Sequence, residues 1–512
     1  MDAVVSPNNP RRGLLVGSVM LATLMQALDT TIANVALPDM QGSLSASQDQ
    51  ISWVLTSYIV AAAIVMPVTG WLAARMGRRR LLILSVTGFT VASLLCGVAS
   101  GIGQMVAFRI LQGLFGASLV PLSQSLMLDS FPREKHGPAM AMWGMGIMVG
   151  PILGPPLGGY LTEHLSWHWV FLINLPVGVL ALFGLLASVP KEALQRRRLD
   201  GVGLALLVLG IGALQMFLDR GQGEDWFSSV EIQIEAALAV LALYFYGLWW
   251  WRKRDEAMLD LGLFANGNFA ACSALILMVG VVLFATLALL PPYLSSLMGY
   301  PTLLIGVVLA PRGVGTMISM MISGRLLGRV DTRWLVLTGM LLMAWSLHGM
   351  TQFGVTTAQH TIIAMGLLQG LGMGLVFVPI STIAYATLPA HKRTEAASLF
   401  GLVRNIGSSV GISIVMTLLA RATQINHAEL GARIPAFGAE MTLLPSLWDP
   451  ATASGAVLLN NELGRQAVAV GYLNNYWMMM WLTLAAIPLL LLMRTPKATS
   501  EPAAAGSAAD AH

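Results

Sequence analysis

Charged residues are scarce in this chain. Asp, Glu, Lys and Arg make up 11% of its 512 residues, whereas a soluble domain has roughly 25%. Hydrophobic residues account for 56% of the sequence, and the mean hydropathy is +0.72. Because a chain with so little charge cannot cover a water-exposed surface, the composition excludes a soluble globular protein and predicts a polytopic membrane protein.

The residue patterns of common catalytic and metal sites are also missing. Cys96 and Cys272 are the two cysteines, and both fall in apolar stretches, which excludes a disulfide framework and metal-ligand spacing. The sequence has no phosphate-binding glycine loop, no His/Glu metal motif and no triad spacing. We therefore expect no enzyme, no bound cofactor or metal, and no direct use of ATP.

Apolar runs of roughly 20 residues, each long enough to cross a bilayer as a helix, recur about fourteen times. The alternation of apolar and polar residues that is typical of membrane barrels is absent, so we expect helices. The predicted spans are Gly13–Leu37, Ile51–Ala73, Leu81–Ala99, Gln104–Leu128, Pro138–Leu161, Val170–Ser188, Gly201–Leu218, Val230–Trp251, Phe269–Pro291, Thr302–Leu327, Trp334–Met350, Thr361–Thr387, Ala396–Ala420 and Tyr472–Met493.

The positions of the basic residues agree with this number of spans. With the N-terminus assigned to the cytoplasm, 22 of the 29 Lys and Arg residues fall in inner segments. The excess of positive charge on inner segments predicts that both termini are cytoplasmic. The net charge of +4 then reflects topology and contact with anionic lipid and does not indicate nucleic-acid binding. Four basic residues lie in outer segments and three inside spans: Arg220, Arg421, Arg433 and Arg465, and then Arg109, Arg312 and Arg404.

An internal repeat divides the chain. It predicts two related six-helix bundles, residues 1–190 and 261–495, with two inserted helices in residues 191–260. The tail, residues 496–512, is rich in Ala, Ser and Gly and is predicted to be disordered. Two such bundles around a central cavity are typical of alternating-access transporters. The pairs that recur at an offset of 257 residues are Gln112-Gly113 with Gln369-Gly370, Pro132 with Pro389, Lys135 with Lys392, Gly144 with Gly401, Gly150 with Gly407, and Gly154 with Gly411.

One outer connector, residues 421–471, is far longer than a simple link between helices requires. It carries charges of both signs, including Glu429, Glu440 and Arg465. Two interpretations remain open: a flexible insertion, or a docking surface for a partner outside the cytoplasm.

Asp29 lies deep in the first span, where a charge costs at least a few kcal/mol and is usually functional. It shares one polar stripe of the helix with Gln26 and Asn34. Arg109 enters the fourth predicted span to a comparable depth of about 13 Å, so we expect the two charges to pair. Asp29 is then a candidate proton-binding acid, with Arg109 as its modulator. The alternative is a static ion pair that fixes two helices.

Two further intramembrane cations, Arg312 and Arg404, have no obvious acidic partner in the sequence. They either hydrogen-bond to backbone carbonyls or bind an anionic substrate group or counterion. A set of aromatic and methionine residues either lines an adaptable substrate cavity or serves packing and the interfacial belt: Trp53, Tyr58, Trp143, Met148 and Phe377.

The fifth predicted span is rich in glycine and proline, which allow close helix packing and bending. We predict a conformational hinge at a helix interface. Its motif residues are Gly150, Pro151, Gly154, Pro155, Gly158 and Gly159.

Four segments resemble motifs of the major facilitator superfamily, in particular its fourteen-helix drug:proton antiporters and their EmrB-type exporters. They are LDTTIANVALP (28–38), RILQGLFGA (109–117), GPILGPPLGG (150–159) and WHWVFLINLPVG (167–178). The resemblance implies an all-α major facilitator fold, proton coupling through Asp29 and Arg109, and multidrug efflux across a bacterial inner membrane. It also implies a periplasmic adaptor protein and an outer-membrane channel as partners.

A fifth segment, GWLAARMGRRR (70–80), resembles the superfamily's motif between helices 2 and 3, which contributes Gly70, Gly77 and Arg78. The usual acidic residue of that motif is replaced by Ala74. We expect Asp129 to pair with Arg78 in its place.

Two alternative functions remain open from the sequence. The same fold could take up its substrate by proton symport, or it could act as a membrane sensor or scaffold that binds without transporting.

Overall fold

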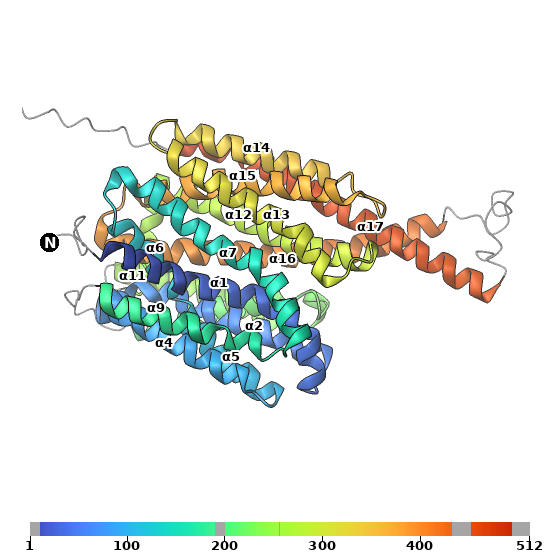
Figure 1. Cartoon of the computed structure of the whole chain (residues 1–512), viewed down its shortest axis with the longest axis horizontal. Helices are drawn as coiled ribbons and strands as arrows, with labels where there is room; N and C mark the ends of the chain where they lie inside the picture. Colours follow the sequence, from blue (N-terminus) through green and yellow to red (C-terminus); the bar gives the residue numbers. More distant parts are fainter. Residues whose placement is uncertain (1–10, 190–199, 255–256, 433–451, 494–512) are drawn as a thin grey trace, which may run out of the picture.

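In a computed structural model of the chain, residues 11–189, 200–254, 257–432 and 452–493 are described (Figure 1). Within these ranges the chain is helical and forms no strand. Thirteen helical segments of the described residues are long and apolar enough to cross a membrane. The remaining predicted span corresponds to helix α14, Thr332–Met350, which packs on α15 and α17. The predicted all-α membrane fold is confirmed.

The first half of the chain contains three predicted spans that are interrupted by short breaks. Pro67 lies in the break of the second span, and the fourth and sixth spans are each divided into two helices. The elements are α1 (Arg12–Ser43), α2 (Gln48–Val65), η1 (Met66–Val68), α3 (Thr69–Met76), α4 (Arg78–Gly97), α5 (Ile102–Gly116), α6 (Leu119–Asp129), η2 (Arg133–Lys135), α7 (His136–His164), α8 (Trp169–Leu172) and α9 (Asn174–Ser188).

The second part of the chain begins with the inserted helix pair. Its elements are α10 (Gly201–Arg220), η3 (Trp226–Ser228), α11 (Val230–Lys253), η5 (Leu261–Ala265), α12 (Gly267–Pro292), the π-helix η6 (Tyr293–Leu297), α13 (Thr302–Leu326), α14, α15 (Gln359–Ala386), η7 (Ala390–Lys392), α16 (Arg393–Ala432), α17 (Ala453–Ala485) and η10 (Ile487–Leu492).

The predicted outer connector, residues 421–471, stays a prediction, but helices extend into both of its ends. Helix α16 continues to Ala432 and α17 already begins at Ala453, so both described ends of the connector are helical. Figure 1 shows the two helices projecting as a hairpin beyond the other helices. The end of an apolar run predicts where the chain leaves the bilayer, but the helix itself can continue beyond that point with polar residues. Residues 433–451, the centre of the connector, lie outside the described residues.

Helices α1–α9 form one group and helices α12–α17 form another (Figure 1). Helix α7 belongs to the first group and lies at its boundary with the second. Helix α7 packs along α1 on one side and along α13 on the other. The inserted helix α10 also contacts both groups, through Thr56 with Asp219 on one side and Gln215 with Ser409, 2.5 Å apart, on the other. The domain boundaries expected from the repeat stay a prediction.

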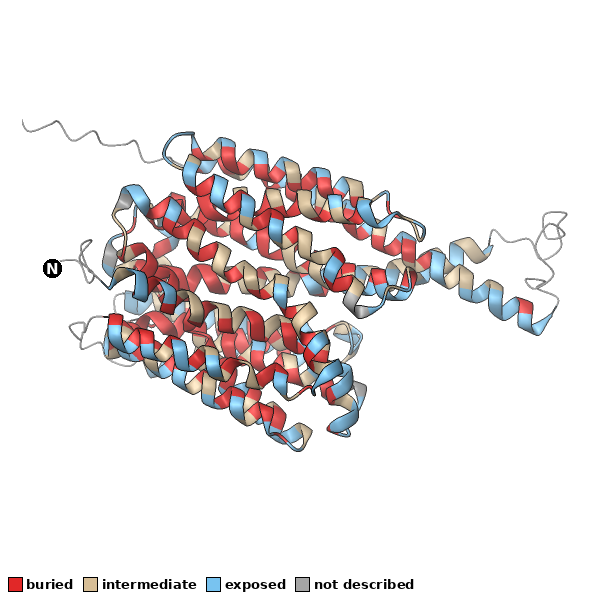
Figure 2. Cartoon of the chain, viewed as in Figure 1, coloured by how far each residue is buried: buried red, intermediate tan, exposed pale blue. Residues whose placement is uncertain are grey.

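Buried residues, red in Figure 2, lie mainly where the helices face one another. Large apolar side chains are exposed on the outer surface, including Leu180, Phe183 and Val240, which are 63%, 68% and 68% exposed. Such a surface suits lipid and would be unusual in water.

At one end of the molecule, Asp129 of α6 joins the two groups. Its carboxylate accepts hydrogen bonds from Arg78 at 2.5 Å and from Arg393 of α16 at 2.7 Å. Nearby, the hydroxyls of Ser125 and Thr394 are 2.8 Å apart. We call this the basic end. The Arg78–Asp129 pair expected in place of the usual motif acid is therefore present, and it extends to an arginine of the other group.

The motif glycines show how closely helices approach. A Cβ atom on Gly70 would lie 2.9 Å from Cα of Glu395, and a Cβ on Gly150 would lie 2.6 Å from the carbonyl carbon of Ala27. Both are closer than a real side-chain carbon tolerates, so these crossings require glycine. Gly77 adopts φ +82° where α3 turns into α4, a backbone conformation that favours glycine.

The glycines of helix α7 differ in how closely neighbouring helices approach them. Gly154 and Gly158 face Thr31 and Ile32 of α1, whereas no atom lies within 4 Å of a Cβ placed on Gly159. The expectation of close packing was therefore wrong for Gly159. The helix runs without interruption from His136 to His164 although it contains Pro151, Pro155 and Pro156. Bending at these positions stays a prediction.

We predict that Gly150→Ala destabilises the protein, because its methyl group would overlap the α1 backbone. Overpacking of this kind costs about 1–3 kcal/mol. The expected result is a lower midpoint of thermal unfolding for the purified protein in detergent. Gly159→Ala, on the same helix but facing open space, is the matched control and should unfold like the unmodified protein. Equal midpoints for both variants would contradict the packing described here.

Candidate functional site

Asp29 lies at the middle of α1 and is completely buried. Its Oδ2 atom lies 2.7 Å from Nη1 of Arg109 on α5, which is also almost fully buried at 1% exposure. The structure thus brings together the two charges whose pairing the sequence led us to expect. A desolvated pair of this kind is stable only when its remaining hydrogen-bonding capacity is satisfied.

Gln112 satisfies part of that capacity for both charges. It follows Arg109 by three residues, so both side chains project from one face of α5. Its Nε2 donates to Oδ1 of Asp29 at 2.7 Å, while its Oε1 accepts from Nη1 of Arg109 at 2.8 Å. The amide therefore bridges the carboxylate and the guanidinium.

Asn174 and Ser93 complete the surroundings of the carboxylate. Nδ2 of Asn174, at the start of α9, donates to Oδ1 of Asp29 at 3.2 Å and to Oγ of Ser93 at 3.0 Å. The Ser93 hydroxyl donates in turn to the carbonyl of Phe171 at 2.8 Å. Four helices, α1, α4, α5 and α9, thus converge on one buried acid. We call Asp29, Ser93, Arg109, Gln112 and Asn174 the Asp29 cluster.

Arg109 is also held on its other side. Its Nε donates to the carbonyl of Val54 on α2 at 2.9 Å. Its guanidinium carbon lies 4.5 Å from the ring centroid of Tyr58, one turn further along α2, and 5.6 Å from that of Phe171. Cation–π contacts strengthen when they are shielded from water. The cation is therefore fixed in place by three helices.

The arrangement can do one kind of chemistry, which is to exchange a proton at Asp29. Both carboxylate oxygens face N–H donors from Arg109, Gln112 and Asn174. An ionised carboxylate only accepts hydrogen bonds, whereas a protonated one also donates. Protonation of Asp29 would therefore turn one acceptor into a donor and weaken its hydrogen bonds with these groups.

Sequence reasoning found Asp29 and Arg109 but missed Gln112, Asn174 and Ser93 as members of the site. A signal existed for Gln112, because it lies three residues after Arg109 and recurs in the repeat. Asn174 lies within a motif segment, yet nothing in the sequence places it beside Asp29, which is 145 residues away.

The other predicted contact residues of helix α1 do not join the cluster. Gln26 is half-buried one turn before Asp29. Asn34 is exposed, and its Nδ2 donates to the carbonyl of Thr30 in its own helix at 3.2 Å. The polar stripe thus runs from a buried centre to an exposed end.

The predicted aromatic and methionine residues have different neighbours in the structure. Tyr58 belongs with Arg109, as described above. Trp143 of α7 is buried and stacks on Phe377 of α15 with ring centroids 6.3 Å apart, which joins the two groups. Met148 is half-buried on α7. Trp53 lies beneath Arg220 of the inserted helix α10, 5.5 Å from its guanidinium carbon. The five residues do not line a single surface.

The two remaining cations lie in the second group of helices. Arg312 of α13 is 7% exposed, and its Nη2 donates to the carbonyl of Leu283 at 3.4 Å. Arg404 of α16 is half-buried. Among the described residues, no ion pair with a carboxylate forms at either guanidinium.

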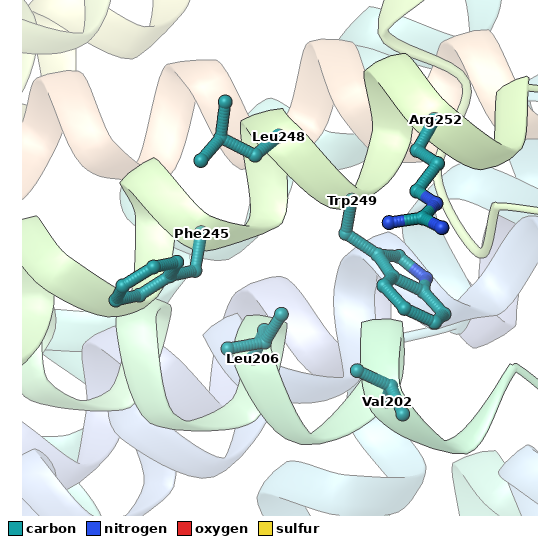
Figure 3. Close-up of a pocket in the computed structure, with 6 residues that line it drawn as sticks. All are labelled: Val202, Leu206, Phe245, Leu248, Trp249 and Arg252. Atoms are coloured by element: carbon teal, nitrogen blue, oxygen red, sulfur yellow. The ribbon is translucent and has the colours of Figure 1, made fainter.

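A pocket lies between the inserted helices α10 and α11, near the basic end (Figure 3). Its lining is apolar except for one guanidinium and an indole nitrogen, and none of the lining residues belongs to the Asp29 cluster. We therefore place it outside the candidate site. The lining residues are Val202, Leu206, Phe245, Leu248, Trp249 and Arg252.

Comparison with known proteins places this geometry in a family. The model of the Major Facilitator Superfamily matches residues 19–412, which include the whole Asp29 cluster. The chain belongs to the major facilitator superfamily. It is a multi-pass membrane protein of that family and not an enzyme.

Relatives of this superfamily member cover most of its length. It is 39% identical over 430 residues to the multidrug export protein EmrB of Escherichia coli K12, which covers 82% of each chain. It is 35% identical over 484 residues to the fatty acid resistance protein FarB of Neisseria gonorrhoeae, which covers 94% of this chain and 95% of the relative. The resemblance to EmrB-type transporters is confirmed.

A solved structure supports the fold independently. The crystal structure of the human organic anion transporter MFSD10 (TETRAN) aligns with a TM-score of 0.59 and covers 93% of this chain and 100% of that one. The sequence identity is 14%, so the likeness concerns the fold alone.

We predict strong energetic coupling between Asp29 and Arg109. Arg109→Met leaves a buried carboxylate without its cation and should destabilise the protein by about 3–5 kcal/mol. The double variant Asp29→Asn/Arg109→Met removes both charges and should lose much less than the sum of the two single variants. Thermal unfolding of the four purified proteins gives the coupling free energy. Additive single effects would contradict a direct interaction.

Proposed function

We propose that this protein exports hydrophobic and amphipathic compounds across a bacterial inner membrane in exchange for protons. The observation that carries the proposal is a fully buried carboxylate, Asp29, which accepts hydrogen bonds from three side chains on two other helices, α5 and α9. Intramembrane acids of this kind are typical of proton relays in transporters. The names of the relatives, a multidrug export protein and a fatty acid resistance protein, support export as the direction.

Helix α7 would couple substrate to proton. It packs against α1, which carries Asp29, and Oγ1 of Thr31 on α1 donates to the carbonyl of Gly150 on α7 at 3.2 Å. On its other side α7 packs against α13 of the second group. A rocking motion between the groups would therefore shift α1 relative to α5 and α9, which hold Arg109, Gln112 and Asn174. That shift separates donors from Asp29 and allows it to take up a proton.

The basic end would be the cytoplasmic gate. Asp129 there holds Arg78 of the first group and Arg393 of the second, and basic residues favour the cytoplasmic side. These contacts must break for the cytoplasmic side to open. In the alternating-access cycle we assign the arrangement described here to the state closed toward the cytoplasm, with both termini on that side.

We predict that Asp29→Asn abolishes substrate-induced proton release from everted membrane vesicles, because an amide cannot exchange a proton. Asp39→Asn is the matched control: Asp39 lies on the same helix but is exposed near its end, and its variant should exchange normally. The measurement is the pH change inside energised vesicles on addition of a cationic dye such as ethidium. Normal exchange by Asp29→Asn would refute the role assigned to this residue.

The same measurement separates the two alternative functions. Proton symport would produce a pH change of the opposite direction on substrate addition. A sensor or scaffold would bind the dye in proteoliposomes and produce no flux.

We further propose that the hairpin of α16 and α17 is the docking surface for a periplasmic adaptor, as part of a tripartite pump with an outer-membrane channel. At 40 and 33 residues, these helices are longer than the roughly 20 residues that a bilayer requires. Beyond the other helices they still pair, with Nδ2 of Asn426 donating to the carbonyl of Ala467 at 3.3 Å. Ile425 and Val457 are 58% and 59% exposed there. Apolar side chains exposed to water favour a protein partner.

We predict that Val457→Asp/Leu458→Asp weakens adaptor binding, because both side chains are exposed on the hairpin. The measurement is co-purification with the single-span, coiled-coil adaptor encoded in the same genome. Asn461→Asp, exposed on the same helix, adds a negative charge without removing an apolar group and is the control. Equal recovery of the adaptor by all three proteins would refute this docking surface.

A further inference from the structure

The repeat conserves an amide contact but not the acid. Thr286 on α12 lies 257 residues after Asp29, the offset that also separates Gln369 from Gln112. Nε2 of Gln369 donates to Oγ1 of Thr286 at 3.2 Å, just as Nε2 of Gln112 donates to Asp29. The second group of helices thus keeps the glutamine and has a neutral hydroxyl in place of the carboxylate.

A buried cation nevertheless lies beside that hydroxyl. Nη2 of Arg312 reaches the carbonyl of Leu283, which is one helical turn from Thr286 on α12. The Arg312 and Gln369 side chains therefore converge on the same turn. Nη1 of Arg312 is buried and has no hydrogen-bond partner among the described residues.

Tyr476 of α17 adds a second unpaired donor. It is completely buried, and its Oη atom has no hydrogen-bond partner within the described part of the chain. It lies close enough to Arg312 to interact with it electrostatically. One turn further along α17, Sδ of Met479 lies 3.9 Å from Oγ1 of Thr286. Helices α12, α13, α15 and α17 thus meet around Arg312, Thr286, Gln369 and Tyr476, which we call the Arg312 cluster.

The buried arginines of the two halves differ in the hydrogen-bond acceptors around them. Arg109 has a carboxylate at 2.7 Å, a side-chain amide and a carbonyl as acceptors. Arg312 has one carbonyl at 3.4 Å. Removing a guanidinium from water without a counterion is costly, and both Nη1 of Arg312 and Oη of Tyr476 are buried donors without an acceptor among the described residues.

We propose that the Arg312 cluster is an anion-binding site, with Arg312 as the cationic anchor and Tyr476 as the second donor. The ligand is a monovalent anion, either the carboxylate of an amphipathic transported compound or a free halide. Arginine and a phenol hydroxyl are both suited to such a ligand, because each presents N–H or O–H donors to it. For the carboxylate, the inference rests on the proposed export function and extends it to acidic substrates.

The site is distinct from the proton site. Asp29 is held by α1, α4, α5 and α9, whereas Arg312 is held by α12, α13, α15 and α17. A substrate carboxylate could therefore be neutralised in one half while Asp29 exchanges its proton in the other. With two separate sites, the carboxylate of an acidic compound would bind Arg312 and would not compete with Asp29 for Arg109.

Binding of dodecanoate and of its uncharged methyl ester to the purified protein in lipid nanodiscs tests the proposal. We expect dodecanoate to bind the unmodified protein at least tenfold more tightly than the ester. Arg312→Gln should abolish that preference, and Arg312→Lys should retain part of it. Arg325→Gln removes a positive charge from the exposed end of the same helix and should leave the preference unchanged. Tyr476→Phe, which removes one hydroxyl, should weaken dodecanoate binding several-fold and gives a second test if Arg312→Gln does not fold.

A chloride series identifies the source of the anion. If the ligand is a halide, replacing gluconate with chloride should raise the midpoint of thermal unfolding of the unmodified protein but not of Arg312→Gln, and dodecanoate binding should not depend on Arg312. If neither dodecanoate nor chloride distinguishes the unmodified protein from the Arg312 and Tyr476 variants, the proposed site is refuted.

Proton release driven by ethidium is measured as well, because it tests the proposed exchange function and not the anion site. Arg325→Gln, which lies outside the Arg312 cluster, should exchange ethidium for protons like the unmodified protein and should keep the preference for dodecanoate. Absence of proton release in the unmodified protein would refute the exchange function, while the dodecanoate and chloride measurements would still decide the anion site.

Discussion

The ion pair of Asp29 and Arg109 is the constraint on which the first half of the molecule depends. Two charges have been removed from both water and lipid, and hydrogen bonds from neighbouring side chains and backbone groups offset part of that cost. Gln112 bridges the two charges, Asn174 and Ser93 extend the network, and Val54 supplies a backbone carbonyl. The positions of five helices relative to one another are thereby fixed by a single carboxyl group, and any motion that disturbs one helix changes the surroundings of that group.

Under the proposed exchange mechanism, helix α7 would transmit such a motion because it packs against helices of both groups. Gly150 allows the α1 backbone to approach so closely that even a methyl group would overlap it. On the opposite side, a Cβ on Gly306 of α13 would lie 3.2 Å from Pro156. Close packing on both sides leaves little slack, so a displacement of the second group of helices is passed to α1 instead of being absorbed by side chains. The stacked pair of Trp143 and Phe377 spans the same interface.

The sequence predicts the fold and the centre of the site well, because both depend on local signals. Apolar run length, the inner position of basic residues and the depth of Asp29 are properties of short segments. The ligands of Asp29 depend instead on contacts between helices, and Asn174 could not be placed beside it without the fold. Residue type alone left two roles open for Trp53, and only the fold shows that it lies under Arg220 of an inserted helix. The hairpin ends of α16 and α17 were missed because polar residues end a hydropathy run without ending a helix.

Under the two proposals above, the asymmetry between the halves would allow a duplicated scaffold to perform two tasks. Duplication preserved the packing residues and the glutamine of each half, since Gln112 and Gln369 both donate to the first helix of their own group. The charges diverged: one half has an acid and a base that satisfy each other, and the other has Thr286 and an arginine without an acid among the described residues. A half whose charges are balanced can gain and lose a proton, whereas a half with an excess positive charge favours an anion. The same helical frame therefore suits proton exchange on one side and recognition of a charged ligand on the other.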